Sequence, residues 1–270
     1  MKASLIKYES NACGEKVIFD VKDHIYRLEK NGKRLISVTQ TIDKFAPEFH
    51  TDIMAKRSEA TYGEDASVIK HAWREHNETA KENGSWMHNY LEAYALGLPT
   101  EKPKDTYTRE RCKHMRNVVD TITKGARDVV VEKILFSEKL GLAGTVDLLV
   151  LLDDGLMILD WKTSAQIIQF SRYHQKMLSP IEYLEDCNFV HYSLQLNFYK
   201  RLLIEEGYYP DVSKYEMGIV HIRDKTTFFP VNHMDSDIDK LLNAVAAQNA
   251  AAELAPVAQL DRAPSFEVGG

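Results

Sequence analysis

The sequence predicts one α/β domain in which helices cover a single mixed β-sheet. Continuous apolar, β-prone runs occupy residues 129–136, 144–152 and 156–161, and stretches with a helical pattern lie before and after them. Apolar runs this continuous are typical of strands that are buried on both faces. The 270-residue chain also has no internal repeat and no clear linker, which favours one domain over two.

The first 50 residues predict a β-hairpin followed by a short helix. Residues 17–21 and 24–28 are short β-prone runs, and Asn31-Gly32 is a strong hairpin-turn signal. A short helix is expected up to Phe45, because Pro47 cannot continue it.

Residues 51–127 predict a helical region. Polar helical sequence runs through residues 52–97, with interruptions expected at Gly63 and Gly84, and a second helical stretch covers residues 106–127. That second stretch carries six basic residues: Arg109, Arg111, Lys113, Arg116, Lys124 and Arg127. Such a charge run is either a solvated helix face or a phosphate-binding surface.

The remaining elements follow the central strands. The tight turn at residues 153–155 joins two of those strands as a hairpin, and a helix is expected over residues 189–206. Strands near residues 215–223 and 226–231 complete the sheet. An Ala-rich helix near residues 236–254 ends the expected domain, which spans residues 1–256 with its core at 128–231 and a C-terminal helical part at 232–256.

Residues 257–270 predict a terminus outside this fold. Residues 257–263 permit a coding sequence that resembles the D-arm of a bacterial tRNA gene. The segment is therefore expected to be either a reading frame that runs into a tRNA gene or a polar disordered end.

Composition excludes several classes of protein. Hydrophobic residues make up 44% and charged residues 27% of the chain, as in globular proteins, and no apolar run reaches the ~18 residues of a membrane span. The three cysteines are far apart, which excludes a disulfide framework. We therefore expect a reduced cytoplasmic protein. A net charge of −6 argues against a non-specific nucleic-acid coat, but the distribution of charge matters more than its total.

Three charged residues near the central hairpin carry the chemistry. Asp160 and Lys162 are two apart on one expected strand and so point to the same face, and the hairpin turn brings Asp147 back beside them. Burying these charges without partners would cost several kcal/mol. A plain Asp–Lys ion pair at a strand end is the alternative, but the full spacing favours a site for a hard divalent cation such as Mg²⁺.

These residues resemble the PD-(D/E)XK nuclease superfamily. Residues 144–147, Gly-Thr-Val-Asp, followed by Asp160-Trp161-Lys162-Thr163, are similar to the GxxD…DxKT motif of its RecB-like and phage-type exonuclease branch. Gln195 and Tyr199 match the QxxxY helix of that branch, and His88 with Glu92 matches its upstream helix. The resemblance runs from about residue 35 to 223 and implies a restriction-endonuclease-like core.

The resemblance also implies roles for individual residues. Asp147, Asp160, His88 and the backbone carbonyl of Trp161 would bind the metal, and Lys162 would be the catalytic lysine together with both aspartates. Further roles are implied for Glu132 as an additional acid, for Gln195 and Tyr199 in contacting DNA or bracing the site, and for Arg109, Lys113 and Arg116 in contacting phosphates.

The function implied by the resemblance is a Mg²⁺-dependent DNA exonuclease, with Mn²⁺ as a possible substitute. It would resect DNA ends for recombination or repair, beside a separately encoded strand-annealing recombinase. A structure-specific or restriction-like endonuclease and a catalytically silent DNA-binding scaffold are the alternatives. The three cysteines do not offer the four ligands of an iron–sulfur cluster, and the chain lacks a Walker A sequence, so neither a cluster nor a bound nucleotide is expected.

Overall fold

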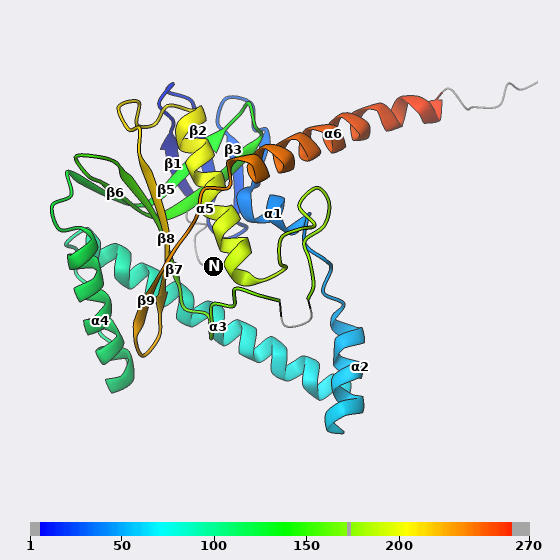
Figure 1. The fold of residues 1–270 in the computed structure, drawn as a ribbon, viewed down its shortest axis with the longest axis horizontal. Coiled ribbons are helices and arrows are strands. Elements are labelled where there is room, and N and C mark those ends of the chain that lie inside the picture. The colour runs from blue at the N-terminus through cyan, green and yellow to red at the C-terminus, as the bar shows by residue number, and fades with distance from the viewer. Residues whose placement is uncertain (1–5, 172–173, 261–270) are drawn as a thin grey trace, which may run out of the picture.

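A mixed β-sheet forms the centre of the protein in the computed structural model, which describes residues 6–171 and 174–260 (Figure 1). Nine strands belong to this sheet within the described residues, and helices flank it. The α/β class and the restriction-endonuclease-like arrangement expected from the sequence are confirmed.

An antiparallel meander forms one end of the sheet. It consists of β1 (Ile6–Ser10), β2 (Lys16–Asp20), β3 (Ile25–Leu28) and β4 (Arg34–Ser37). β1 is not predicted from the sequence, because a five-residue edge strand with polar residues at its end carries little β signal. The turn at Gly32 has a positive φ of 70°, as the hairpin signal there requires.

Among the described residues, the core strands leave one segment of β6 unpaired along one edge. They are β5 (Asp128–Ser137), β6 (Leu142–Leu151), β7 (Leu156–Lys162), β8 (Tyr215–Ile222) and β9 (Thr226–Pro230). β5 pairs with β6 along its length, whereas on the other edge β4 pairs only at residues 142–143 and β7 only at residues 148–151. Residues 144–147 of β6 therefore face a gap between two ladders.

Helices pack on both faces of the sheet. On one face, α1 (Val38–Asp43), α5 (Asn188–Glu205) and α6 (Asp235–Leu260) cover a core that includes Val146 and Leu149 of β6. On the other face, α4 (Thr106–Ile122) and the end of α3 (Ala66–Ala95) cover Leu148 and Val150. Leu148, Leu149 and Val150 thus alternate between opposite cores, which explains why this part of β6 is apolar.

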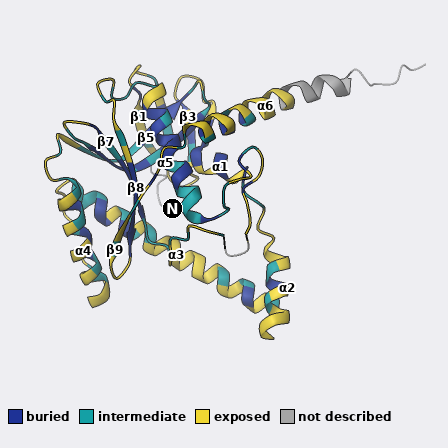
Figure 2. Cartoon of the chain, viewed as in Figure 1, coloured by how far each residue is buried: buried dark blue, intermediate teal, exposed yellow. Residues whose placement is uncertain are grey.

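α2 (Thr51–Tyr62) and the first part of α3 extend away from the sheet (Figures 1 and 2). Gly63 ends α2 with a φ of 75°, in agreement with the interruption expected there. The interruption expected at Gly84 is wrong, because α3 continues through it. A glycine inside a helix costs only about 1 kcal/mol relative to alanine, so a single glycine does not by itself end a long helix.

The C-terminal helix is longer than expected. α6 continues to Leu260, four residues into the segment 257–270, and residues 261–270 of that segment lie outside the described residues. No helix in the described part of the chain has the length and apolarity needed to cross a membrane.

Candidate active site

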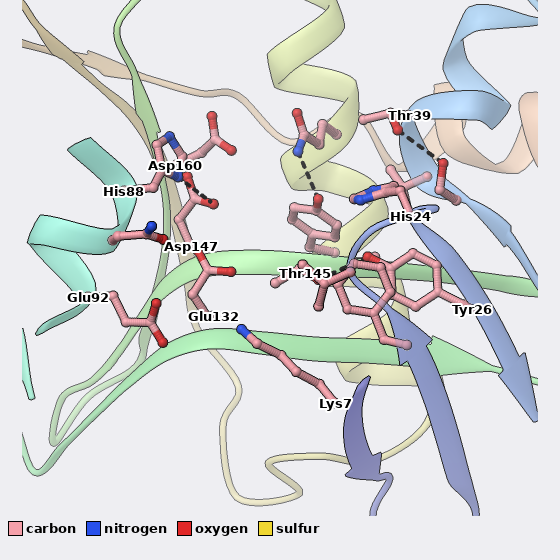
Figure 3. A pocket seen from close by; sticks show the side chains of 18 of the residues that line it. Lys7, His24, Tyr26, Thr39, His88, Glu92, Glu132, Thr145, Asp147 and Asp160 are labelled. Atoms are coloured by element: carbon pink, nitrogen blue, oxygen red, sulfur yellow. Dashed lines mark hydrogen bonds and ion pairs between the residues drawn. The ribbon is translucent and has the colours of Figure 1, made fainter. Parts of the chain in front are cut away.

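A cleft of about 610 Å³ lies at the gap beside β6 (Figure 3). One side of it carries acidic residues and a histidine from α3 and the core strands, and the other side is formed by the meander, α1 and α5. The cleft contains the side chains of Asp147, Asp160 and Lys162. The structure therefore brings together the three charged residues around which the sequence argument was built.

The two aspartates are held differently. Asp147 Oδ2 accepts a hydrogen bond from the backbone N–H of Trp161 at 2.8 Å, which ties β6 to β7 where their ladder ends. Asp160 is only 1% exposed, and Lys162 Nζ lies 2.6 Å from its Oδ2. Neither oxygen of Asp160 has a hydrogen bond of good geometry among the described residues, so the ion pair with Lys162 leaves its acceptor capacity unfilled.

Lys162 has a second contact on the opposite side of the cleft. Its Nζ lies 4.5 Å from the centre of the Tyr192 ring of α5. A cation over an aromatic face at this distance is attracted to it. The ammonium group is thus held between Asp160 and an aromatic ring.

His88 connects α3 to both core strands. Its Nε2 lies 3.1 Å from the backbone oxygen of Trp161, and its Nδ1 lies 3.6 Å from Asp147 Oδ1. Three of the four groups that the resemblance assigns to one cation, His88, Asp147 and the carbonyl of Trp161, therefore lie close together.

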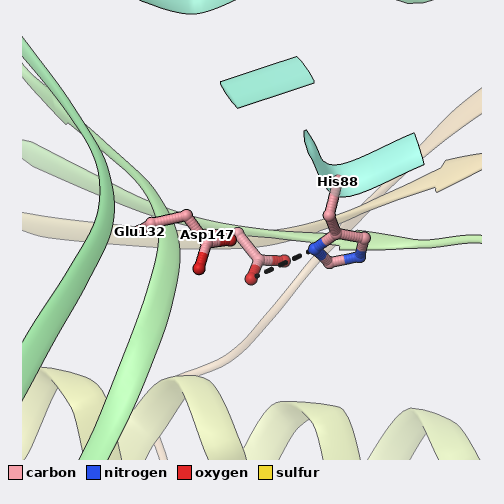
Figure 4. A group of neighbouring side chains, drawn as sticks. All are labelled: His88, Glu132 and Asp147. Carbon is pink, nitrogen blue, oxygen red and sulfur yellow. Dashed lines mark ion pairs between the residues drawn. The ribbon is translucent and has the colours of Figure 1, made fainter. Parts of the chain in front are cut away.

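Glu132, which lies on β5, completes a cluster with His88 and Asp147. It falls opposite Asp147 in the register of β5 and β6, between the pairs Val131↔Leu148 and Lys133↔Val146. Its φ of +48° removes it from the regular ladder, a conformation that non-glycine residues rarely adopt. Ligand atoms of His88, Glu132 and Asp147 all lie within 4.8 Å of one another (Figure 4).

The pKa values in this cluster depart from their ordinary range. Burial raises the pKa of Glu132 to about 7 with help from Asp147, and burial raises the pKa of Asp160 to about 6 despite the opposing effect of Lys162. Burial opposes the charged form of His88, but the negative charge of Asp147 outweighs it and raises the pKa of His88 to about 9. These shifts are what is expected when several carboxylates share a small buried volume.

The donor set fits a divalent cation. Carboxylate and carbonyl oxygens are preferred by Mg²⁺ and Mn²⁺, and an imidazole nitrogen is a ligand for transition metals. His88 must release its proton before that nitrogen can bind a cation. The unfilled oxygens of Asp160 and the close approach of His88, Glu132 and Asp147 make this fit specific to the cleft.

Gln195 and Tyr199 reach the cleft from α5. Gln195 Nε2 donates a hydrogen bond of 2.7 Å to Tyr199 Oη. The Tyr199 ring lies directly against Gly144, where a Cβ atom would come within 2.6 Å of its Cε1 atom. Close packing of β6 against α5 thus explains why the first position of the GxxD sequence is a glycine.

The basic residues expected to contact phosphates lie elsewhere. Lys113 lies 3.9 Å from Glu110 on the surface of α4, and Arg109 is also exposed. Arg116 lies over the rings of Tyr90 and Tyr94 of α3, with its Cζ 6.0 and 5.8 Å from their centres. None of the three lines the cleft, so a role for them in binding phosphate would need DNA that extends beyond it.

Comparison with known families identifies the chain. The model of the PD-(D/E)XK nuclease superfamily matches residues 61–266. The protein belongs to this superfamily. PD-(D/E)XK nucleases use divalent metals, in agreement with the donor set in the cleft.

The other comparisons add little about this nuclease. No curated protein matches the chain. A solved structure titled "Crystal structure of SSO0001" is similar over 62% of this chain and 86% of its own, with 13% identity and a TM-score of 0.25. A likeness this loose carries no argument about fold or function.

The nuclease cleft also contains residues that no sequence motif indicated. The meander contributes Lys7, Phe19, His24 and Tyr26, and α5 contributes the contact of Tyr192 with Lys162. For Tyr192 a signal exists, because it precedes Gln195 by three residues and so shares its helix face. For the meander residues the sequence holds no local signal, since their position depends on how the meander docks.

Proposed function

We propose that this nuclease is a metal-dependent DNA exonuclease that uses Mg²⁺ or Mn²⁺ to hydrolyse phosphodiester bonds. The observation that carries the proposal is the buried Asp160, whose two oxygens find no good hydrogen bond in the described part of the chain. Lys162 lies 2.6 Å away, and Asp147 shares the same cleft. A scaffold that only binds DNA has no need for such an arrangement.

The residues have the following roles in the proposal. Asp147, Asp160, His88 and the carbonyl oxygen of Trp161 hold the cation, with Glu132 as an additional acid. A bound divalent cation neutralises charge on the phosphate and lowers the pKa of a coordinated water. Hydrolysis then joins the oxygen of water to phosphorus and breaks one P–O ester bond.

Lys162 is the catalytic lysine in this proposal. Its ammonium group stabilises the negative charge that develops on the phosphate oxygens during attack. Asp160 and Tyr192 position it from two sides. Gln195 and Tyr199 brace the cleft from α5, where Tyr199 is almost fully buried and Gln195 is partly exposed at the cleft.

The exonuclease activity and the phage-type role rest on the GxxD…DxKT and QxxxY sequences together. In this role the enzyme resects DNA ends for recombination or repair. The strand-annealing partner and the phosphate contacts of Arg109, Lys113 and Arg116 stay predictions.

An end-labelled duplex assay with Mg²⁺ tests the proposal. We expect wild type to shorten the duplex and Lys162→Ala to lose at least roughly 100-fold in rate, as for loss of a group that stabilises transition-state charge. Lys139→Ala is the matched control, because Lys139 is exposed and pairs with Glu205 away from the cleft.

Two results would contradict the proposal. Full activity of Lys162→Ala would remove the catalytic assignment. Cleavage of a covalently closed circular DNA at the rate of the linear form would replace the exonuclease with an endonuclease on the same site.

A further inference from the structure

The meander presents one row of side chains to the cleft. Lys7 of β1 is in register with Phe19 of β2, and Phe19 is in register with Tyr26 of β3. Residues directly opposite one another on neighbouring strands point to the same face of a sheet. All three line the cleft, and Figure 3 shows Tyr26 on the side away from the acidic cluster while the amino group of Lys7 points toward Glu132.

This row is fastened to the strand that carries Asp147. Tyr26 Oη lies 2.9 Å from Thr145 Oγ1, and Thr145 precedes Asp147 by two residues on β6. The rings of Phe19 and Tyr26 stack at 4.3 Å with an angle of 11°. Because Phe19 and Tyr26 are almost fully buried, their role is to fix the meander against the site.

His24 packs beside Phe19 and Tyr26 and is accessible to solvent. It lies in the turn between β2 and β3 with a φ of 52°, and it is exposed. Its ring is nearly perpendicular to those of Phe19 and Tyr26, at 5.1 and 5.6 Å, so neither ring stacks on it. An aromatic ring is thus held at the cleft without a stacking partner among these neighbours.

Lys7 brings a cation to the same side. Its side chain is partly buried and lines the cleft, and its charge offsets a part of the rise that burial causes in the pKa of Glu132. No ion pair within 4.0 Å of its ammonium group exists among the described residues. Two other lysines of the meander, Lys16 and Lys30, pair with glutamates.

We propose that His24 and Lys7 form a nucleotide subsite beside the cluster of His88, Glu132 and Asp147. His24 stacks on the base of a nucleotide adjacent to the scissile phosphate, and Lys7 contacts a phosphate of the same strand. The inference rests on the proposed function, because it assigns the substrate of the same cleft. Stacking on an aromatic ring tolerates any base, so the subsite grips DNA without selecting a sequence.

Abasic substitution tests the contact of His24. End-labelled duplexes carry one abasic nucleotide at successive positions from the end, and kcat/KM is measured with the full chain and Mg²⁺. For wild type, one position should lower kcat/KM by roughly five- to fiftyfold, the range of one lost base stack. His24→Asn should show a similar loss on intact DNA and no further loss at that position.

Two variants separate stacking from folding. Asparagine tolerates a positive φ as well as histidine does, so His24→Asn removes the ring and leaves the turn intact. His24→Phe restores a ring and should recover most of the activity on intact DNA. The assignment of His24 would be overturned if the losses in kcat/KM from His24→Asn and from the abasic position multiplied. It would also be overturned if no position were sensitive to abasic substitution.

Salt dependence tests Lys7. Each phosphate contact contributes about −0.9 to the slope of log affinity against log salt on duplex DNA, so Lys7→Met should make the slope shallower by about one unit. The slope is measured by fluorescence anisotropy of a labelled duplex in EDTA, where the DNA stays intact. Lys16→Met is the control, since Lys16 does not line the cleft, and an equal slope for both variants would remove Lys7 from the subsite.

The anisotropy and cleavage assays together distinguish the two proposals. If wild type binds the duplex with the predicted sensitivities but does not cut it, the subsite stands and the proposed hydrolysis falls. If wild type cuts DNA and the His24 and Lys7 variants behave like it, the subsite falls alone. If wild type neither binds nor cuts DNA, both fall.

Discussion

α3 and α5 lie on opposite sides of the cleft, and the rest of the protein holds these two helices in different ways. α5 is buried along most of its length, and Tyr199 is packed against Gly144 in the middle of the sheet. α3 is nearly twice as long, but near the cleft it buries only Met87, Tyr90 and Leu91.

Because the two helices are held differently, substitutions on them are expected to change different properties of the protein. Side chains on α5 are positioned by the same contacts that hold the fold together. His88 on α3 is positioned by a short packed segment and by its contacts with Asp147 and Trp161. Substitutions at the α5 side should therefore change folding stability, whereas substitutions at the α3 side should change affinity for the cation.

The largest expected effect is on the α3 side. His88→Ala should weaken Mn²⁺ binding by at least roughly 10-fold, because it removes the proposed nitrogen ligand, and loss of even an outer-shell partner of a ligand has an effect of this size. The melting temperature in EDTA should change little, since His88 is not part of the apolar core. Calorimetric titration measures the affinity, and His71→Ala on the exposed part of the same helix is the control. Equal affinity for the two variants would contradict the assignment of His88.

On the α5 side we expect the reverse result. Gly144→Ala places a Cβ atom within 2.6 Å of the Tyr199 ring, and overpacking of this kind costs about 1–3 kcal/mol of unfolding free energy. Urea denaturation measures the loss. The double variant with Tyr199→Leu should recover part of it, and a loss that is unchanged in the double variant would show that Tyr199 is not the cause.

The acidic cluster adds a pH dependence to the comparison. The pKa of Glu132 is about 7 in the fold against an ordinary value of 4.5, so the folded state binds the proton more tightly. Metal-free protein should therefore lose stability as pH rises from about 4.5 to 7, by an amount of the order of 2 kcal/mol. Glu132→Gln should flatten this slope in EDTA, and a slope that persists in the variant would point to another group.

The smallest expected effect concerns Tyr192, which links α5 to Lys162. Tyr192→Leu should lower kcat by roughly three- to tenfold, the worth of one cation–π contact, while Tyr192→Phe should remain near wild type. The cleavage assay on the end-labelled duplex measures both. If the Tyr192→Phe and Tyr192→Leu variants are equally impaired, the hydroxyl of Tyr192 matters more than its ring.

The central part of the site could be predicted because it depends on short-range geometry. One hairpin turn sets the register of β6 and β7, so the spacing of Asp147, Asp160 and Lys162 determines that they meet. The helix period likewise places Gln195 and Tyr199 on one face of α5. These relations need no knowledge of how distant segments pack.

The opposite side of the cleft could not be predicted in this way. Lys7 and His24 reach the site only because β4 pairs in parallel with β6 at residues 142–143, more than a hundred residues further along the chain. For the basic residues of α4, exposure could be predicted from the sequence but direction could not. Their charge pattern predicts an exposed face, but the buried stripe of Cys112, Met115 and Val119 decides where that face points.

The unbroken course of α3 has a mechanical consequence. Its 30 residues make a rod about 45 Å long, and residues 74–83 are all exposed. The rod is clamped near the cleft around residues 87–91, beside the imidazole of His88. A load applied at the N-terminal end of α3 therefore acts as a torque on that clamp, because the helix is continuous between the two points.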